Sequence, residues 1–398
     1  MVHLAIITAA MGIAGIAGGS SMDYGFDRTI SRRVLENYLA RAITMMDLCS
    51  GRIDPSDDVR MLGSIGAKFA GRTVYLWGGE QHLEAKLEHA RETAARLHRQ
   101  DPQMILQAGI FEIVTTEVEK VPVPGWAFEE FGLPVENRTF RYASMLFEDG
   151  KFHDHWSKGQ SVPDITRVET RMWFYYLARR YMDAGMEAIH WGQVALIGAT
   201  DKDWAGWRDV LSRARAYARR KARRHLLLCD AHTPDGGPIH EGRLLFDFHS
   251  FPLRIKEVAG KPQQGMLEVG YLDSIFKRSK GGTSPSGWKC DSLPYLVEFD
   301  NWGVSPRPGE GGQPWWTWGW DEISWFAHQP EAYRNEWLKY AWDWVRRTDA
   351  NGFLQMPGSR CLHHPVGDLW WYRANTRSPA CPDGFSQEET IKRIWQGR

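Results

Sequence analysis

Cysteine is scarce in this sequence, with five residues among 398 and no CxxC pair. The odd number and the wide spacing argue against a disulfide framework and against a structural zinc site. An excess of charge is also absent, because 49 Lys and Arg residues balance 49 Asp and Glu residues. This balance removes the electrostatic reason to expect nucleic acid as the main partner.

The sequence also lacks an apolar run long enough to span a bilayer. Its most apolar segment, residues 4–19, is rich in glycine, and only a histidine precedes it where a secretory signal carries Lys or Arg. We interpret this segment as part of the fold and predict no contact with a membrane. A cytoplasmic location is expected, with secretion as the alternative.

Tryptophan, in contrast, is abundant, with 20 residues in an otherwise ordinary globular composition of 43% hydrophobic and 25% charged residues. A large flat ring with one N–H group is costly to leave in water. The excess therefore indicates either a very aromatic core or a ligand with flat apolar faces. Sugars have such faces on their C–H sides.

Apolar runs typical of strands alternate with amphipathic helical stretches, which is the pattern of βα units around a parallel sheet. The predicted strands are residues 67–77, 104–114, 140–147, 188–192, 226–230, 244–249, 295–300 and 353–356. Eight such units predict an α/β protein of the (β/α)8 TIM-barrel type with long βα loops. Residues 1–66 are expected to form an extension with a helix at 32–46, and residues 67–398 the barrel.

Polar residues end three successive predicted strands. Reactive groups of such a barrel come from the C-terminal ends of its strands, and a charged group inside an apolar strand is costly unless a ligand or partner uses it. The alternation of side chains places each set on one face and predicts a shared pocket. The three sets are Asp230 with His232, Asp247 with His249, and Glu298 with Asp300 and Asn301.

Together with a neutral chain and a Trp-rich segment at 302–325, these strand ends resemble the (β/α)8 retaining glycoside hydrolases of clan A. The resemblance is architectural, covers residues 67–360 and rests on no short diagnostic motif. It implies cleavage of an oligo- or polysaccharide by double displacement, without a cofactor. In that superfamily the nucleophile is a Glu at the end of strand seven, which implies this role for Glu298 in Leu-Val-Glu-Phe-Asp-Asn-Trp-Gly.

The sequence departs from this pattern at the end of strand four, where the superfamily has its acid/base Glu. The strand reads Glu-Ala-Ile-His-Trp-Gly-Gln-Val-Ala, and its exit holds Gln193 and Ala195 but no acid. A second carboxyl is needed about 5–5.5 Å from the nucleophile. Position 195 is two residues after Gln193 and is therefore expected to face inward as well. We favour the interpretation that this position normally holds the acid/base Glu and that Ala195 replaces it.

The missing acid at the end of strand four allows two alternatives to this replacement. In the first, the barrel has lost catalysis and only binds a saccharide. In the second, the acid comes from another loop, and its candidates are Glu80, Glu112, Asp230 and Glu322.

Further side chains are predicted to bind the substrate. Trp191 and Trp302 are expected to stack on sugar rings, together with the loop that contains Trp320. The polar and aromatic residues predicted to hold hydroxyl groups are Trp77, Glu80, Glu112, His190, Gln193, Asp230, His232, Asp247, His249, Asp300, Asn301 and Glu322.

The histidines also permit a different enzyme, a metal-dependent barrel hydrolase or isomerase. The His-x-His pair of that type, His153 and His155, falls here in a loop after the third predicted strand. Strand eight supplies Gln355 and Met356 where an Asp is expected. We therefore predict no metal, and the sequence yields no prediction of oligomeric state.

Overall fold

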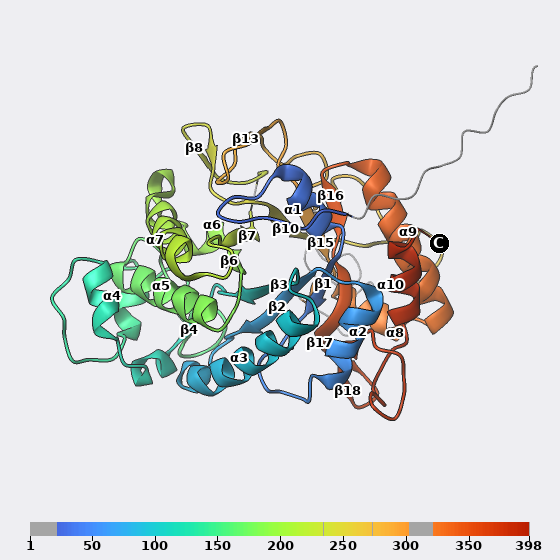
Figure 1. Ribbon diagram of the computed structural model, residues 1–398, viewed down its shortest axis with the longest axis horizontal. Coiled ribbons are helices and arrows are strands. Elements are labelled where there is room, and N and C mark those ends of the chain that lie inside the picture. The colour runs from blue at the N-terminus through green and yellow to red at the C-terminus, as the bar shows by residue number, and fades with distance from the viewer. Residues whose placement is uncertain (1–21, 234, 273, 302–320, 398) are drawn as a thin grey trace, which may run out of the picture.

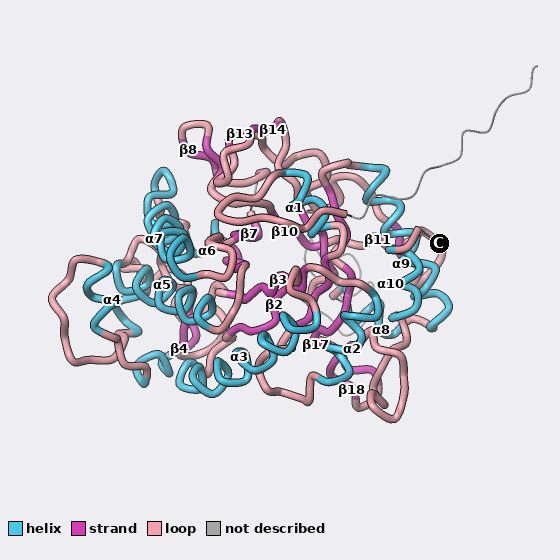
Figure 2. The backbone as a smooth tube through the Cα atoms, viewed as in Figure 1, coloured by secondary structure: helices cyan, strands magenta, loops and turns pink. Residues whose placement is uncertain are grey.

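The computed structural model describes residues 22–233, 235–272, 274–301 and 321–397. Within these residues, a ten-stranded sheet forms the centre in the order β16-β15-β10-β7-β6-β3-β2-β1-β17-β18. All neighbours in it pair in parallel except β17 and β18. The sheet curls, and helices surround it (Figures 1 and 2). The protein is therefore of the mixed α/β class that the sequence predicts.

The strands of this sheet follow one another in chain order from β1 to β16. Their bounds are β1 (Ala42–Met45), β2 (Phe69–Tyr75), β3 (Ile105–Gly109), β6 (Ala188–Gln193), β7 (Leu228–His232), β10 (His249–Pro252), β15 (Tyr295–Glu298), β16 (Gly352–Leu354), β17 (Met356–Val366) and β18 (Leu369–Arg373). One residue, Gln355, separates β16, which pairs with β15, from β17, which pairs with β1.

Short strands occur outside this sheet. The pair β4 (Val114–Thr115) and β5 (Gln160–Ser161) and the pair β11 (Lys256–Glu257) and β12 (Gly265–Met266) are antiparallel. A small sheet has the order β14-β13-β9-β8. Its strands are β8 (Ile239–His240), β9 (Arg243–Leu244), β13 (Gly282–Thr283) and β14 (Lys289–Cys290).

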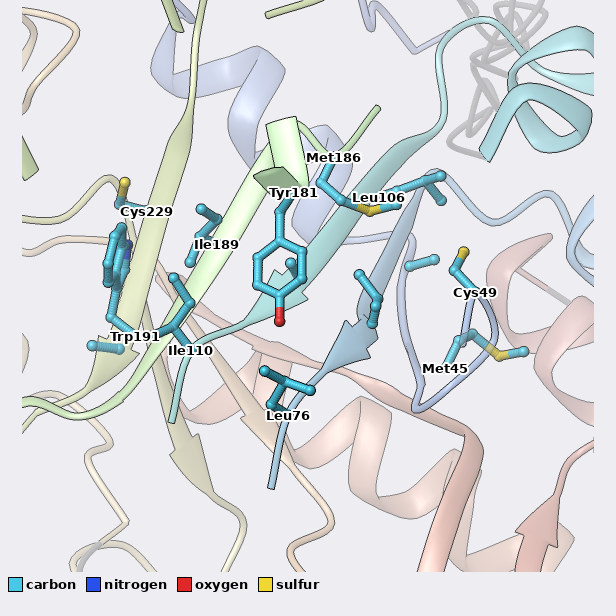
Figure 3. Packing of buried hydrophobic residues seen from close by; sticks show 14 of the residues in the cluster. Met45, Cys49, Leu76, Leu106, Ile110, Tyr181, Met186, Ile189, Trp191 and Cys229 are labelled. Atoms are coloured by element: carbon cyan, nitrogen blue, oxygen red, sulfur yellow. The ribbon is translucent and has the colours of Figure 1, made fainter. Parts of the chain in front are cut away.

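The longer helices bury one side against the outer face of the central sheet. In α3, apolar residues recur every three or four positions from Leu83 to Leu97 and are buried, as an amphipathic helix requires. Figure 3 shows Tyr181 of α5 lying near Ile189 of β6 and near Leu76, which directly follows β2. The helices are α1 (Arg32–Leu39), α2 (Ser56–Ile65), α3 (Leu83–Gln100), α4 (Gly125–Glu130), α5 (Val168–Asp183), α6 (Val194–Ile197), α7 (Ala205–Lys221), α8 (Glu322–His328), α9 (Glu331–Thr348) and α10 (Glu388–Trp395).

In the part of the chain that the structure describes, four 3₁₀ turns join these elements: η1 (Glu80–His82), η2 (Thr116–Lys120), η3 (Tyr142–Met145) and η4 (Lys202–Trp204). None of the helices in the described ranges is both long enough and apolar enough to cross a bilayer.

The inner face of the sheet carries an apolar layer at the N-terminal ends of the strands. Leu35 and Leu39 of α1 pack against this layer and close it at that end. Two residues further along, the alternation brings polar side chains to the same face in the other strands, whereas β2 has Gly71 there. The apolar layer consists of Ala42, Phe69, Ile105, Ala188, Leu228, Phe248, Leu296 and Phe353.

Two predicted elements are wrong. The predicted third strand at 140–147 holds the turn η3 instead, because its apolar residues, such as Phe140 and Met145, are buried under α5 without pairing to a strand. The predicted helix at 32–46 ends at Leu39, and Ala42–Met45 forms β1 between β2 and β17. The predicted boundary at residue 66 therefore leaves one strand of the sheet outside the predicted barrel.

The two errors compensate in the strand count. One strand is missed before residue 67 and one false strand is added at 140–147, so the strands at 188–193 and 295–298 keep their fourth and seventh places. The predicted sixth strand at 244–249 is displaced, because β10 begins only at His249.

Candidate active site

A cavity of about 440 Å³ lies at the C-terminal ends of the central strands. Aromatic side chains form one part of its wall, and the rest is mostly charged and polar. The aromatic residues are Tyr75, Trp77, Phe111 and Trp156. The others are Met46, Arg72, Glu112, His190, Gly192, Gln193, His232, Asp300, Asn301, Arg360, Cys361 and His363.

Glu298 ends β15 and lies directly beneath this cavity, with no exposed surface. Three residues of the cavity wall contact its carboxylate. Arg72 Nη2 donates to Oε1, His232 Nε2 lies 3.0 Å from the same oxygen, and Arg360 Nη1 donates to Oε2 at 2.9 Å. Glu298 thus shares the inner face with Leu296, as the alternation predicts.

The two guanidinium groups decide the charge of Glu298. Burial alone would raise the pKa of this carboxyl, but Arg72 and Arg360 hold it well below the ordinary value of 4.5. Glu298 is therefore an ionised carboxylate at neutral pH. An ionised oxygen can act as a nucleophile or can serve as the anchor of the two arginines.

A second buried network supports Arg72 from the other side. His190 Nδ1 lies 2.8 Å from Asp230 Oδ2, and its Nε2 lies 3.3 Å from Arg72 Nη2. Gln107 Nε2 donates to Asp230 Oδ1 at 2.6 Å, and Ser250 Oγ donates to Oδ2. Because Arg72 can only donate, His190 accepts at Nε2 and carries its proton on Nδ1.

Burial shifts both titratable members of this network. It raises the pKa of Asp230 to about 7. Burial, with the nearby Arg72 charge, lowers the pKa of His190 well below its ordinary value of 6.5. The imidazole is therefore neutral at pH 7, which agrees with its acceptance of a hydrogen bond from Arg72.

Arg72 reaches this position through an irregular backbone. The register of β2 against β3 shifts between Ala70 and Val74, and Arg72 has φ 59°, in the left-handed region. Such a conformation costs about 1–3 kcal/mol for a residue with a Cβ and is enriched at functional sites. The bulge places a guanidinium group on the inner face, where Gln107 Oε1 accepts from the Arg72 backbone N–H at 3.2 Å.

Glu112 supplies a second carboxylate to the cavity wall. Its Oε2 accepts from the backbone N–H of Gln193 at 2.9 Å, and its Oε1 accepts from Gln193 Nε2 at 3.0 Å. Gly192, with φ 60°, makes this approach possible, because a Cβ at that position would collide with Glu112 Oε2. Strand β6 therefore positions an acid that belongs to the loop after β3.

An aromatic corner stands next to Glu112. Trp77 is 46% exposed and packs edge to face against Phe111 and Trp156, with ring centroids 5.8 and 5.1 Å away. Trp156 Nε1 donates to the carbonyl oxygen of Glu112 at 2.8 Å. A half-exposed indole held in place by other rings offers a flat apolar platform for a ligand.

A second cavity of about 440 Å³ adjoins the first and shares Gln193, His232 and Asp300 with it. Ala195, in the short helix α6 after β6, lines this second cavity. Asp300 Oδ1 accepts from Arg360 Nη2 at 3.1 Å, and Asp300 Oδ2 lies 3.6 Å from Arg254 Nη1. The predicted acid/base position, Ala195, thus lines the second cavity and not the first.

The structure brings several predicted site residues together around the first cavity. Some line it directly, and Glu298 and Asp230 lie immediately beneath the lining residues. The predicted residues in the wall are Trp77, Glu112, His190, Gln193, His232, Asp300 and Asn301.

Trp191 does not join this group. It is fully buried on the outer face and packs against Phe174 and Trp207 of the helices. The reason is the alternation itself, because Trp191 follows the inward-facing His190 by one residue. Its predicted stacking on a sugar is therefore wrong.

Four predicted acids and histidines also lie away from the cavity wall. Glu80 accepts from the Thr115 backbone N–H at 2.7 Å and from its hydroxyl, so it fixes the loop of η1. Glu322 pairs with Arg254 at 2.9 Å. Asp247 pairs with Arg215 at 3.1 Å and accepts from the backbone N–H of Cys229, near the start of β7. His249 Nδ1 lies 3.0 Å from Ser279 Oγ.

The remaining predictions concern metal ligands and the Trp-rich loop. In the described parts of the chain, no group of three or more His, Cys, Asp or Glu side chains is arranged to hold a metal ion. His153 of the predicted pair instead has its Nε2 2.9 Å from the carbonyl oxygen of Phe147. Trp302 and Trp320 lie outside the described residues.

Sequence reasoning missed the two cations that hold Glu298. Arg72 lies within the predicted strand 67–77, so a charge inside an apolar strand was a usable signal. Arg360 follows the predicted end of strand eight at 356, while β17 continues to Val366. A correct length for that strand would have placed Arg360 in the wall.

No protein-family model matches the chain, and no curated protein matches it. Among solved structures, an α-galactosidase from Thermus thermophilus has a TM-score of 0.31 at 15% identity, over 56% of this chain and 42% of that one. An endo-glycoceramidase II from Rhodococcus sp. has a TM-score of 0.40 at 10% identity, over 89% and 78%. A β-L-arabinopyranosidase from Geobacillus stearothermophilus has a TM-score of 0.35 at 8% identity, over 90% and 70%.

These similar structures are glycoside hydrolases, the group that the sequence resembles. The chain spans less than half the length of the α-galactosidase. At TM-scores of 0.40 and below, the likeness carries no argument for an activity. The functional proposal therefore rests on the residues of the cavity.

Proposed function

We propose that the cavity binds a saccharide and that the chain is a glycosidase of the retaining type, built on a complete (β/α)8 barrel. The barrel would close through Gln355, since β16 pairs with β15 and β17 with β1. One observation carries the proposal. The ionised Glu298 ends the seventh parallel strand beneath a cavity that also holds a second carboxylate, Glu112, and an exposed indole, Trp77.

In this mechanism Glu298 attacks the anomeric carbon while the general acid protonates the glycosidic oxygen, so that the leaving alcohol departs and a glycosyl-enzyme forms. The same group, now a base, then deprotonates a water molecule that attacks the anomeric carbon, releases the sugar and frees Glu298. The sugar must take over part of the space around one carboxylate oxygen, because Arg72 covers Oε1 and Arg360 covers Oε2. The two guanidinium groups would hold Glu298 ionised for attack. Trp77 would stack against the ring on the other side of the scissile bond.

Two positions compete for the role of general acid and base. Glu112 lines the cavity in the chain as it stands. Position 195 is the alternative, in which Ala195 replaces a Glu and the chain is an acid-deficient form. The two assignments predict opposite changes in turnover for the variants Glu112→Gln and Ala195→Glu.

The deciding experiment compares Glu112→Gln and Ala195→Glu with the parent chain on a panel of aryl glycosides and oligosaccharides. Loss of an acid/base group costs about 10²–10⁴-fold in rate. If Glu112 is the acid, Glu112→Gln lowers turnover by that factor, azide restores part of it, and Ala195→Glu gives no gain. If position 195 is the acid site, Ala195→Glu raises turnover by a similar factor. Glu119→Gln, an exposed neighbour, is the matched control.

A second candidate is a saccharide-binding barrel without turnover. The observation in its favour is that Glu298 has no exposed surface and accepts hydrogen bonds at both oxygens. Calorimetry with the same oligosaccharides separates the two functions, because a binding protein retains affinity while every variant is inactive. Absence of saccharide binding by the parent chain would contradict both.

A further inference from the structure

A cleft of about 440 Å³ lies outside the central sheet, between α7 and the small sheet of β8, β9, β13 and β14. Figure 1 shows β8 and β13 at the same end of the molecule as α7. None of its lining residues lines the two cavities at the strand ends. The lining residues that bear on its chemistry are Arg208, Arg215, Arg219, His240, Arg243 and Ser284.

The spacing along α7 explains why three of these arginines meet here. Positions 208, 215 and 219 are seven and four residues apart, which places their side chains on one helix face. Residues 213–224 contain seven basic side chains, and several others of this run are paired elsewhere. Arg213 pairs with Asp209, and Arg223 and Arg224 pair with Glu187.

Three of the four arginines that line the cleft lack such partners, and the side chains of these three are exposed. Arg215 pairs with Asp247, but Arg208, Arg219 and Arg243 form no ion pair or side-chain hydrogen bond with any described residue. Among the described residues of the wall, the one acid is Glu241, whose side chain is 83% exposed and lies 3.8 Å from His240. The cleft therefore carries an excess of positive charge in a chain whose formal net charge is zero.

A buried hydroxyl adds an independent observation. Ser284 is 3% exposed and lines the cleft, and its Oγ has no hydrogen-bond partner among the described residues. A buried polar atom without a partner costs about 1–3 kcal/mol. The Oγ itself has less than 1 Å² of exposed surface, so the hydroxyl must first rotate about χ1 toward the cleft before a ligand there can accept its hydrogen bond and remove this cost.

We propose that this cleft binds a tetrahedral oxyanion, the phosphate or sulfate group of a small molecule. Arg208, Arg219 and Arg243 would donate to its oxygens, and the Ser284 hydroxyl would donate to one more. Guanidinium groups match the geometry of such anions with paired N–H donors. The volume of about 440 Å³ leaves room for the organic part of the ligand.

The test uses calorimetry on the full chain with inorganic phosphate and inorganic sulfate, against chloride at matched ionic strength. Glucose 6-phosphate and glucose 6-sulfate then distinguish the two esters. The double variant Arg208→Ala/Arg243→Ala should weaken phosphate binding at least tenfold. The matched control removes two exposed arginines elsewhere, Arg33→Ala/Arg91→Ala, and should leave binding unchanged.

Ser284→Ala provides a variant that keeps the fold. It removes a hydroxyl that has no partner, so the midpoint of unfolding should not fall, while phosphate affinity should drop several-fold. The proposal is overturned if the double variant and the parent bind phosphate equally, or if the parent binds neither anion at millimolar concentration. Binding of a DNA oligonucleotide without binding of phosphate or glucose esters would assign the surface to nucleic acid instead and would also overturn it.

Discussion

Glu298 keeps its negative charge although water does not reach its side chain. The cost of removing a carboxylate from water is several kcal/mol, and here two guanidinium groups and an imidazole offset it. The same contacts leave Arg72 and Arg360 dependent on Glu298. Each of the three charges is therefore stable only in the presence of the others.

Replacing this carboxylate tests that dependence. Glu298→Gln should lower the free energy of unfolding at pH 7 by about 3–5 kcal/mol, because it leaves two buried cations without their anion. The folded-state pKa of Glu298 is depressed, so its contribution is fully present above about pH 4.5 and is lost as pH falls toward the folded-state value. Urea unfolding of the parent and of Glu298→Gln from pH 7 to pH 3 should show that the difference between their free energies of unfolding becomes smaller below pH 4.5. A difference in free energy of unfolding that does not change with pH would contradict an ionised Glu298.

Gly192 offers a second test at the residue scale. Both Gly192 and Gly66 have positive φ, 60° and 72°, and Ala at either costs about 1–2 kcal/mol in backbone energy. Only at Gly192 does the new Cβ meet Glu112, whereas no atom lies within 4 Å at Gly66. Gly192→Ala should therefore destabilise the protein by at least ~1 kcal/mol more than Gly66→Ala in thermal unfolding. Equal losses would mean that Glu112 moves aside freely.

At the scale of elements, the spacing of apolar residues along the sequence made most strands of the sheet predictable. The predicted strands at 67–77, 104–114, 188–192, 226–230 and 295–300 all match strands of the sheet at shifted bounds. The missed strand β1 has four residues and continues the apolar pattern of the helix before it, so its sequence alone does not mark a break. The false strand at 140–147 is apolar because it is buried under α5.

The site was predictable where polar residues end an apolar strand, as at Glu298, Asp230 and His232. It was not predictable where a bulge changes which residue faces inward, as at Arg72. The alternation of side chains along β6 also places Trp191 on the outer face, because its neighbour His190 faces inward. Contacts such as that of Glu112 with Gln193 depend on loop conformation and leave no periodic signal.

At the scale of the whole molecule, the sheet depends on residues before position 67. β1 pairs with β2 on one side and with β17 on the other, and α1 covers the apolar layer of the inner face. A chain that begins at residue 67 should therefore lose cooperative unfolding, while one that begins at residue 22 keeps every described element and should retain it. Circular dichroism during heating checks this. A cooperative transition in the shorter chain would show that residues 1–66 are a separable extension.

The contacts of Glu298 join distant parts of the chain, and this has a consequence for biosynthesis. Arg72 precedes Glu298 by 226 residues, and Arg360 follows it by 62 residues. When the ribosome has just added the carboxylate, one of its two cations already exists and the other has not yet been translated. The charges beneath the cavity are therefore balanced only after Arg360 has emerged, and a prematurely terminated product that ends before Arg360 would contain the anion with half of its counter-charge.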